Sequence, residues 1–200
     1  MGRGASWYRG DCHVHSVHSD GELTPKELAY RARAVGLDFI ATTEHNSAAA
    51  PGVWTPLAAD DFLIMLGEEV TSKTGHWLAL GTSPGQIVDW NCRARDGLIE
   101  RCLDQVHRVG GLCVVAHPHA PYLSGDFMYS FRGFDAVEVW NGPWTSDRPG
   151  TQTTRPTWQS EGGVSQPAST RARGCRRWAT APRTRKGRSA PLIRWSSPQS

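Results

Sequence analysis

A short segment near the N-terminus, residues 11–20, carries the side chains best suited to chemistry. It reads Asp-Cys-His-Val-His-Ser-Val-His-Ser-Asp. Side chains repeat every second residue along an extended strand, so His13 and His15 project from one side and can reach the same ion. Imidazole is the commonest neutral ligand for Zn, Mn or Fe(II), and Asp20 adds a carboxylate within reach. The segment therefore predicts three metal ligands.

A histidine-rich surface loop is the alternative interpretation of an isolated His-x-His pair. Residues of the same ligand types recur, however, beside other apolar runs of the chain. They are His45 after the run 37–43, Glu68 and Glu69 at the end of 61–70, His76 at the start of the next run, and His117-Pro118-His119 after 112–116. This recurrence favours a shared metal site.

The elements that must position these residues alternate between strands and helices. We expect strands over 7–13, 37–43, 61–70, 112–116 and 134–140, and one beginning at His76. A helix is expected from Pro25 to about Val35, because Thr24 and Glu27 can form a capping box and Pro25 suits the first helical position. A second helix is expected over 93–109, with an apolar face made by Leu98, Cys102, Leu103 and Val106.

This alternation is typical of α/β proteins with parallel β/α units. Chemistry gathered at the C-terminal ends of strands is how β/α barrels build their sites. Doubly wound sheets also place ligands at strand ends, so periodicity alone leaves both architectures open.

Composition divides the 200 residues into two unlike parts. Residues 151–200 hold nine Arg, one Lys and a single acidic residue, Glu161, which gives a formal charge of +9. The preceding 150 residues carry −6, so the overall charge of +3 describes neither part. A mildly acidic body suits a cation site, whereas the basic tail is typical of a nucleic-acid patch or of non-native sequence.

Cysteine usage and hydropathy indicate where the chain works. Its five cysteines form no Cys-x-x-Cys pair, and their odd number leaves one over in any disulfide scheme. We therefore expect reduced thiols and a cytoplasmic location. No run approaches the ~18 apolar residues of a membrane span, so no membrane partner is expected.

Several motifs, in order along residues 7 to about 144, resemble the PHP (polymerase and histidinol phosphatase) superfamily and, within it, the CehA/McbA-type metallohydrolases. They are Asp11-Cys-His-Val-His-Ser16 with Ser19-Asp-Gly21, the helix opening Leu23-Thr-Pro-Lys-Glu-Leu28, Gly36-Leu-Asp-Phe-Ile-Ala-Thr-Thr-Glu-His-Asn46, Gly67-Glu-Glu-Val-Thr71, Gly75-His76, Ala116-His-Pro-His119 and Val137-Glu-Val-Trp-Asn-Gly142.

The resemblance implies a distorted (β/α)7 barrel, incomplete at its C-terminus, that holds two or three divalent ions (Zn, Mn or Fe) and hydrolyses esters, usually phosphoesters. Carried over position by position, the metal ligands are His13, His15, Asp20, His45, Glu69, His76 and His117. Only one of Glu68 and Glu69 can face the pocket from a strand, and the Gly-x-Glu-Val pattern of the family selects Glu69 as the bridging carboxylate.

Two further residues are candidates for contact with the substrate. His119 and Asn141 can reach it, although a solvated histidine after Pro118 and a polar strand end at Asn141 are equal alternatives. His117 and His119 are the candidates for catalysis, since a histidine can protonate a leaving alkoxide.

The family pattern breaks after residue 144. Family members complete the site with a late Asp-x-His motif, but residues 145–200 contain no His. We therefore divide the chain into a PHP metallohydrolase domain, residues 1–144, and an Arg/Pro/Ser/Thr-rich tail, residues 145–200. The tail has few aliphatic residues after position 150, so we expect it to be disordered.

The genetic code suggests a sharper interpretation of the tail. If each codon is rebuilt from the third base of one residue and the first two of the next, residues 177–181 permit Val-Gly-Asn-Ser and residues 183–184 permit His. Residues 188–198 then permit Val-Gly-Thr-Pro-His-Thr-Val-Val-Leu-Ala. This string resembles the missing motif and final strand, which suggests a frameshift near residues 145–150. The motif's Asp is not permitted from Ala181-Pro182.

The first hypothesis is accordingly a metal-dependent hydrolase with phosphoesterase-like chemistry by metal-activated water. Its substrate would be a small phosphorylated ester, and loss of the late motif would impair it. The alternative is a non-catalytic scaffold whose basic tail binds nucleic acid, with Trp158, Trp178 and Trp195 stacking on bases. Frameshifted GC-rich sequence would give the same composition, so we do not expect nucleic acid as a partner. A catalytically inactive fragment would share the fold and the metals.

Overall fold

The computed structural model describes residues 7–48, 51–118, 127–138 and 192–194. Its strands form one sheet in the order β6-β5-β4-β3-β2-β1-β7. The strands are β1 (Trp7–Val14), β2 (Phe39–Thr42), β3 (Leu63–Ser72), β4 (Gly75–Leu80), β5 (Leu112–Val115), β6 (Ala136–Val137) and β7 (Leu192–Arg194). The helices are α1 (Pro25–Ala34), α2 (Pro51–Trp54) and α3 (Ile99–His107), with 3-10 turns η1 (Thr55–Leu57) and η2 (Ala94–Asp96).

The sheet is mixed, which corrects the expectation of parallel β/α units throughout. Strands β1, β2 and β3 are parallel, and so are β5 and β6, but β4 is antiparallel to both β3 and β5. Ser72 pairs with Gly75, which leaves only two residues between β3 and β4. A connection this short makes a hairpin, because a parallel crossover needs a dozen residues or more. The start of β4 therefore lies at the same edge of the sheet as the end of β3.

Helix α1 begins where the sequence predicts and for the predicted reason. The Glu27 backbone N–H donates to Thr24 Oγ1 at 3.3 Å, and the Thr24 N–H donates to Glu27 Oε2 at 2.9 Å. This capping box satisfies two N–H groups that the first helical turn leaves unpaired. Gly36, with φ 76°, follows the helix in the left-handed conformation that glycine adopts without strain.

Helix α3 is shorter than the 93–109 span expected from its apolar pattern. The 3-10 turn η2 occupies the start of that span, and Gly97, with φ 65°, separates it from α3. The buried face of α3 is Ile99, Cys102, Leu103 and Val106, whereas Leu98 is exposed. The predicted face is thus right except at its first residue.

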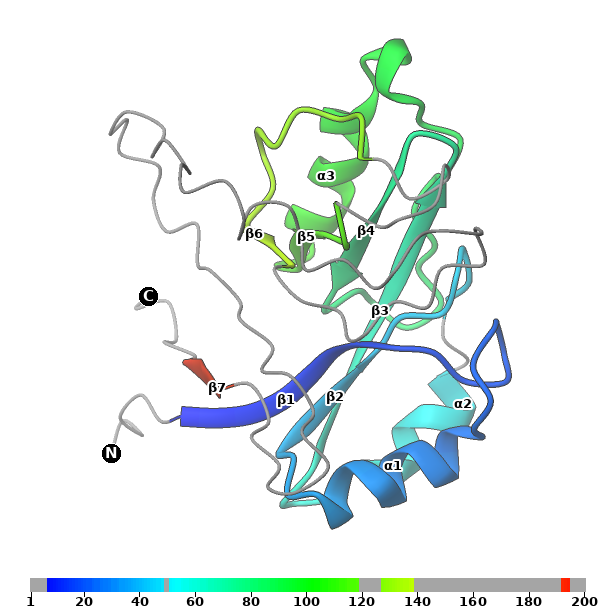
Figure 1. The fold of residues 1–200 in the computed structure, drawn as a ribbon, viewed down its shortest axis with the longest axis vertical. Helices are drawn as coiled ribbons and strands as arrows, with labels where there is room; N and C mark the ends of the chain where they lie inside the picture. The colour runs from blue at the N-terminus through cyan, green and yellow to red at the C-terminus, as the bar shows by residue number, and fades with distance from the viewer. Residues whose placement is uncertain (1–6, 49–50, 119–126, 139–191, 195–200) are drawn as a thin grey trace, which may run out of the picture.

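Helices cover one side of the sheet and leave its other side to a smaller cluster and the candidate site. Helices α1 and α2 lie beside β1 and β2, and α3 lies beside β4 and β5 (Figure 1). On the opposite face Ala41, Leu78, Leu80, Val114, Ala116 and Ala136 pack together. The described strands form a curved, open sheet with α/β layering, and they do not close into a complete barrel.

Most of residues 145–200 lie outside the described part of the chain, and so does the boundary at residue 144. The exception is β7, which pairs with the start of β1 in antiparallel register, Trp7 opposite Arg194. No strand was expected there. The described helices also include none that is both long and apolar enough to cross a membrane.

One cysteine pair lies close together in the core. The sulfur atoms of Cys92 and Cys102 are in contact while their Cα atoms are 7.5 Å apart, and Cys12 and Cys113 are free. The pair meets because the segment before η2 packs against the buried face of α3, in the same core cluster.

Candidate metal centre

A single buried carboxylate, Glu69 on β3, lies at the centre of five histidines. Its side chain has no exposed surface. Oxygen Oε2 lies 3.2 Å from His13 Nε2, 3.1 Å from His15 Nε2 and 3.1 Å from His45 Nδ1. Oxygen Oε1 lies 3.0 Å from His76 Nδ1 and 2.9 Å from His117 Nε2. The two oxygens of one carboxylate therefore face two groups of imidazole nitrogens.

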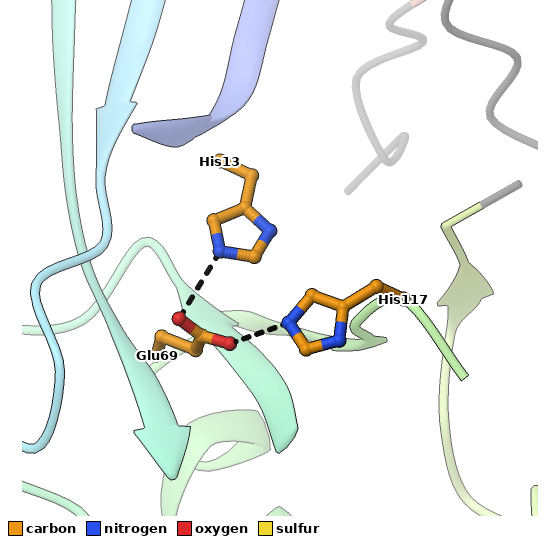
Figure 2. A group of neighbouring side chains, drawn as sticks. All are labelled: His13, Glu69 and His117. Carbon is orange, nitrogen blue, oxygen red and sulfur yellow. Dashed lines mark hydrogen bonds and ion pairs between the residues drawn. The ribbon is translucent and has the colours of Figure 1, made fainter. Parts of the chain in front are cut away.

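The histidines come from separate strands that share one edge of the sheet. His13 lies on β1, His117 follows β5, and Figure 2 shows both rings turned toward Glu69. His45 follows β2 and makes a parallel bridge to Glu69. His76 is the second residue of β4, and the antiparallel direction of that strand returns it to the same edge.

Two potential ion positions share Glu69. We call the first the deep position: His13, His117 and Glu69 place three ligand atoms within 4.8 Å of one another, and their side chains are at most 5% exposed. We call the second the outer position, which His15, His45 and Glu69 form by the same criterion.

Asp20 and His76 extend these two sets of residues. Asp20 Oδ1 lies 3.4 Å from His15 Nδ1 and its Oδ2 lies 3.3 Å from His45 Nε2, so Asp20 belongs beside the outer position. Its side chain is 66% exposed, which marks the solvent side of the centre. His76 is buried against Glu69 Oε1, on the side of the deep position.

The loop that carries His15 and Asp20 is held in place by hydrogen bonds to Glu44. This buried carboxylate accepts hydrogen bonds from the Ser16 backbone N–H, from Ser16 Oγ and from Ser19 Oγ. Gly21 is required in the same loop, because a Cβ there would lie 2.2 Å from the His15 carbonyl oxygen. The loop geometry is therefore set by groups other than the predicted ligands.

The donor set fits divalent cations. His13 Nε2 and His15 Nε2 lie only 3.0 Å apart, and two imidazole lone pairs at that distance need a cation or a proton between them. Glu69 Oε2 is buried and has no hydrogen bond of good geometry within the described residues, although three histidine nitrogens surround it. Nitrogen and carboxylate ligands of this kind suit Zn, Mn and Fe(II).

The electrostatics of the centre keep Glu69 ionised. Burial alone would raise the pKa of Glu69, but the charge of His13 and the close approach of His117, His13 and His15 hold it well below 4.5. Burial lowers the pKa of His45 below 6.5, although Glu69 opposes this effect. His45 is therefore largely neutral near pH 7, the form in which imidazole binds metals.

The neighbouring Glu68 faces the other side of β3. It is fully buried, accepts a 2.9 Å hydrogen bond from the Val88 backbone N–H, and lies against the core under α3. Of the two carboxylates, Glu69 alone is near the histidines, as the period of the strand requires.

Two predicted site residues lie outside the described part of the chain, and two residues of the centre were not predicted. His119 and Asn141, the candidates for substrate contact, lie outside the described residues. Glu138 was not expected in the centre, yet its carboxylate lies 3.2 Å from His13 Nδ1. The motif Val-Glu-Val-Trp-Asn-Gly includes Glu138, but nothing in the motif assigns it a contact with His13. The role of Glu44 likewise follows from no spacing rule.

A third cluster of ligand-type residues lies apart from the centre. His107, Cys113 and Asp135 place their ligand atoms within 4.8 Å of one another. Asp135 Oδ2 already accepts a 2.7 Å hydrogen bond from the Cys113 backbone N–H and lies 2.9 Å from His107 Nε2. Burial raises the pKa of the Cys113 thiol far above its usual range, which opposes the thiolate that a metal would need. These contacts give the cluster a structural role, because Asp135, next to β6, links α3 to β5.

Comparison with known proteins identifies the fold. No family model and no curated protein matches the chain. A two-domain protein from Bacteroides vulgatus, which contains a predicted PHP-like metal-dependent phosphoesterase, matches with a TM-score of 0.55 and 21% identity over 70% of this chain. An inferred metal-dependent phosphoesterase from Bifidobacterium adolescentis matches with a TM-score of 0.50 and 18% identity over 66% of this chain. The chain spans 46% of the first protein and 77% of the second, and it shares the fold of these proteins, the first of which is described as PHP-like.

Proposed function

We propose that this chain is a metal-dependent hydrolase of the PHP superfamily, of the CehA/McbA type, that acts on small phosphorylated esters. The observation that carries the proposal is the sharing of Glu69 between two histidine groups. A buried carboxylate with two oxygens facing separate sets of imidazole nitrogens is suited to bridge two divalent ions. The shared fold with PHP-like phosphoesterases supports the same chemistry.

Each residue of the centre has a part in this proposal. His13 and His117 hold the deep position, with His76 beside it, and His15, His45 and Asp20 hold the outer position. A pair of bound divalent ions supplies an activated water and stabilises charge on a phosphoryl group. The exposed Asp20 side marks where the substrate enters, because the deep position is closed to solvent. His119 and Asn141 are proposed contacts to the substrate.

The metals proposed are two ions of Zn, Mn or Fe. A third ion would need ligands beyond the seven that the described residues bring together. In the family those ligands come from the late Asp-x-His motif, which residues 145–200 do not contain. We therefore expect a two-ion centre of reduced activity in this chain.

Substitution of the two neighbouring glutamates tests the proposal. Glu69→Gln removes the bridging charge, so the metal content of the purified protein should fall by at least one ion per chain. Hydrolysis of p-nitrophenyl phosphate should fall by about 100-fold or to background. Glu68→Gln, one residue away on the opposite face, is the matched control and should retain both properties. A Glu69→Gln protein that keeps its ions, or a wild-type protein with less than one ion per chain, would contradict the proposal.

A further inference from the structure

Glu138, directly after β6, lies on the far side of the His13 ring from Glu69. Its two carboxylate oxygens are 3.2 Å and 3.3 Å from His13 Nδ1. The other nitrogen of the same ring, Nε2, is 3.2 Å from Glu69 Oε2. The imidazole ring thus lies between the two carboxylates. Glu138 contacts only Nδ1, and Nε2 is the nitrogen that faces Glu69 and the deep position.

This arrangement keeps a proton on Nδ1 of His13. A carboxylate accepts a hydrogen bond from an imidazole N–H, so Nδ1 donates to Glu138, and Nε2 is the nitrogen left to bind a cation in the deep position. A carboxylate behind a metal-binding histidine also makes the imidazole a stronger base and holds its ring in one orientation. His13 is therefore prepared to bind a cation through Nε2.

The same carboxylate also holds the second histidine of the deep position. Glu138 Oε2 accepts a 2.9 Å hydrogen bond from the His117 backbone N–H. His117 has φ 25°, a positive value that costs on the order of 1 kcal/mol in a residue other than glycine and needs support from its surroundings. With its backbone held there, His117 places Nε2 at 2.9 Å from Glu69 Oε1.

Glu138 is itself fixed by the sheet. Its backbone N–H donates to the carbonyl oxygen of Val115, two residues before His117, at 2.8 Å, so the end of β5 anchors the backbone of Glu138 close to the histidine that it orients. Its side chain is only 10% exposed, which leaves little water to compete for these bonds.

We propose that Glu138 is a positioning residue that orients His13 and His117 for the deep metal position. This inference rests on the proposed function, because it assigns a role to a residue beside the same metal centre. It predicts that loss of Glu138 weakens the deep position and leaves the outer position unchanged.

Titration of the metal-free full-length protein with Co²⁺ tests this inference. The two binding steps are first assigned with His117→Ala, which should remove the deep step, and with His45→Ala, which should weaken the outer one. Glu138→Ala should then weaken the deep step by about 10- to 100-fold and change the outer step by less than twofold. Glu138→Gln retains one oxygen acceptor and should fall between wild type and alanine. Glu100→Gln, an exposed carboxylate on α3, is the control and should match wild type.

A second readout separates positioning from general support of the fold. Nitrogen NMR of the His13 ring in the metal-free protein should show an Nδ1–H group hydrogen-bonded to a carboxylate in wild type, and this hydrogen bond should be lost in Glu138→Ala. If Glu138→Ala binds Co²⁺ like wild type, the inference is wrong while the proposed function stands. If Glu138→Ala weakens both binding steps equally, and Glu138→Gln is no better than Glu138→Ala, then Glu138 only supports the fold and the inference is wrong. A wild-type protein that binds no Co²⁺ would refute the proposed function and this inference together.

Discussion

Two adjacent carboxylates on β3 show how position along a strand decides the chemistry of a residue. Glu68 and Glu69 are both fully buried, but they face opposite sides of the sheet. Histidines hold the pKa of Glu69 well below its usual range, whereas desolvation under α3 raises the pKa of Glu68 to about 7. Glu69 is ready to bind cations, and Glu68 carries a proton in slightly acidic solution.

The raised pKa of Glu68 predicts a pH-dependent loss of stability. Between pH 4.5 and about 7 the folded protein binds a proton at Glu68 that the unfolded chain releases, so stability falls as pH rises through that window. The full loss is on the order of 3 kcal/mol. Glu68→Gln keeps an acceptor for the Val88 N–H and cannot ionise. At pH 8 it should be about 1 to 3 kcal/mol more stable than wild type, and at pH 4 the two should be similar.

Urea unfolding of the metal-free proteins at both pH values measures this difference. Comparison of the two proteins cancels the titration of the histidines, because that titration is common to both. A stability difference that is the same at pH 4 and pH 8 would show that Glu68 is not the titrating group.

The sequence predicted the candidate metal ligands better than it predicted the residues that hold those ligands in position. Spacing and resemblance placed His13, His15, His45 and Glu69 in one site, and the structure brings them together. Glu138 and Glu44 were missed because each acts across a large sequence separation, 125 residues in the contact between Glu138 and His13. No local pattern encodes such a contact.

At the scale of elements, local signals predicted helix starts and strand positions better than strand directions. Thr24, Pro25 and Glu27 specify the start of α1 by contacts within one turn. The direction of β4 depends on the two-residue turn before it, and the apolar pattern of the strand is the same in either direction. The break before α3 depends on Gly97, whose left-handed conformation an apolar periodicity does not reveal.

The capping box of α1 predicts a measurable contribution to stability. Thr24→Ala removes the acceptor for the Glu27 N–H and should lower the free energy of unfolding by about 1 kcal/mol. Thr24→Ser retains the oxygen and is the matched control, with an expected loss of at most a few tenths of that value. Chemical denaturation measures both, and the metal content should be unchanged in each. An equal loss in the serine and alanine variants would mean that the methyl group, rather than the cap, carries the effect.

For the whole molecule, the curved sheet gathers the predicted ligands of the metal centre from β1 to β5 without a late Asp-x-His motif. The described strands place seven predicted ligands at one edge, and β7 pairs with β1 at the other end of the sheet order. The sequence could predict the fold class because strand and helix periods alternate up to residue 144. It could not predict closure of the barrel, because residues 145–200 lack the apolar pattern that would specify further strands.

A version of this chain whose codons after about residue 145 are read in the shifted frame should be the more active hydrolase. The shifted reading supplies a late His and a Val-Val-Leu run suited to a strand, so ions at the centre should gain a ligand and lose mobile water. Stabilisation of a phosphoryl group depends on ions held in place before the reaction, so the turnover number should rise more than the Michaelis constant changes.

With saturating Mn²⁺ or Zn²⁺, we expect p-nitrophenyl phosphate hydrolysis to be about 10-fold faster or more in the shifted-frame protein. The measurement uses matched preparations that differ only after residue 145. The control is a His-to-Ala change at the histidine that residues 183–184 permit in the shifted frame. Equal turnover in all three would show that the late motif is dispensable for this centre.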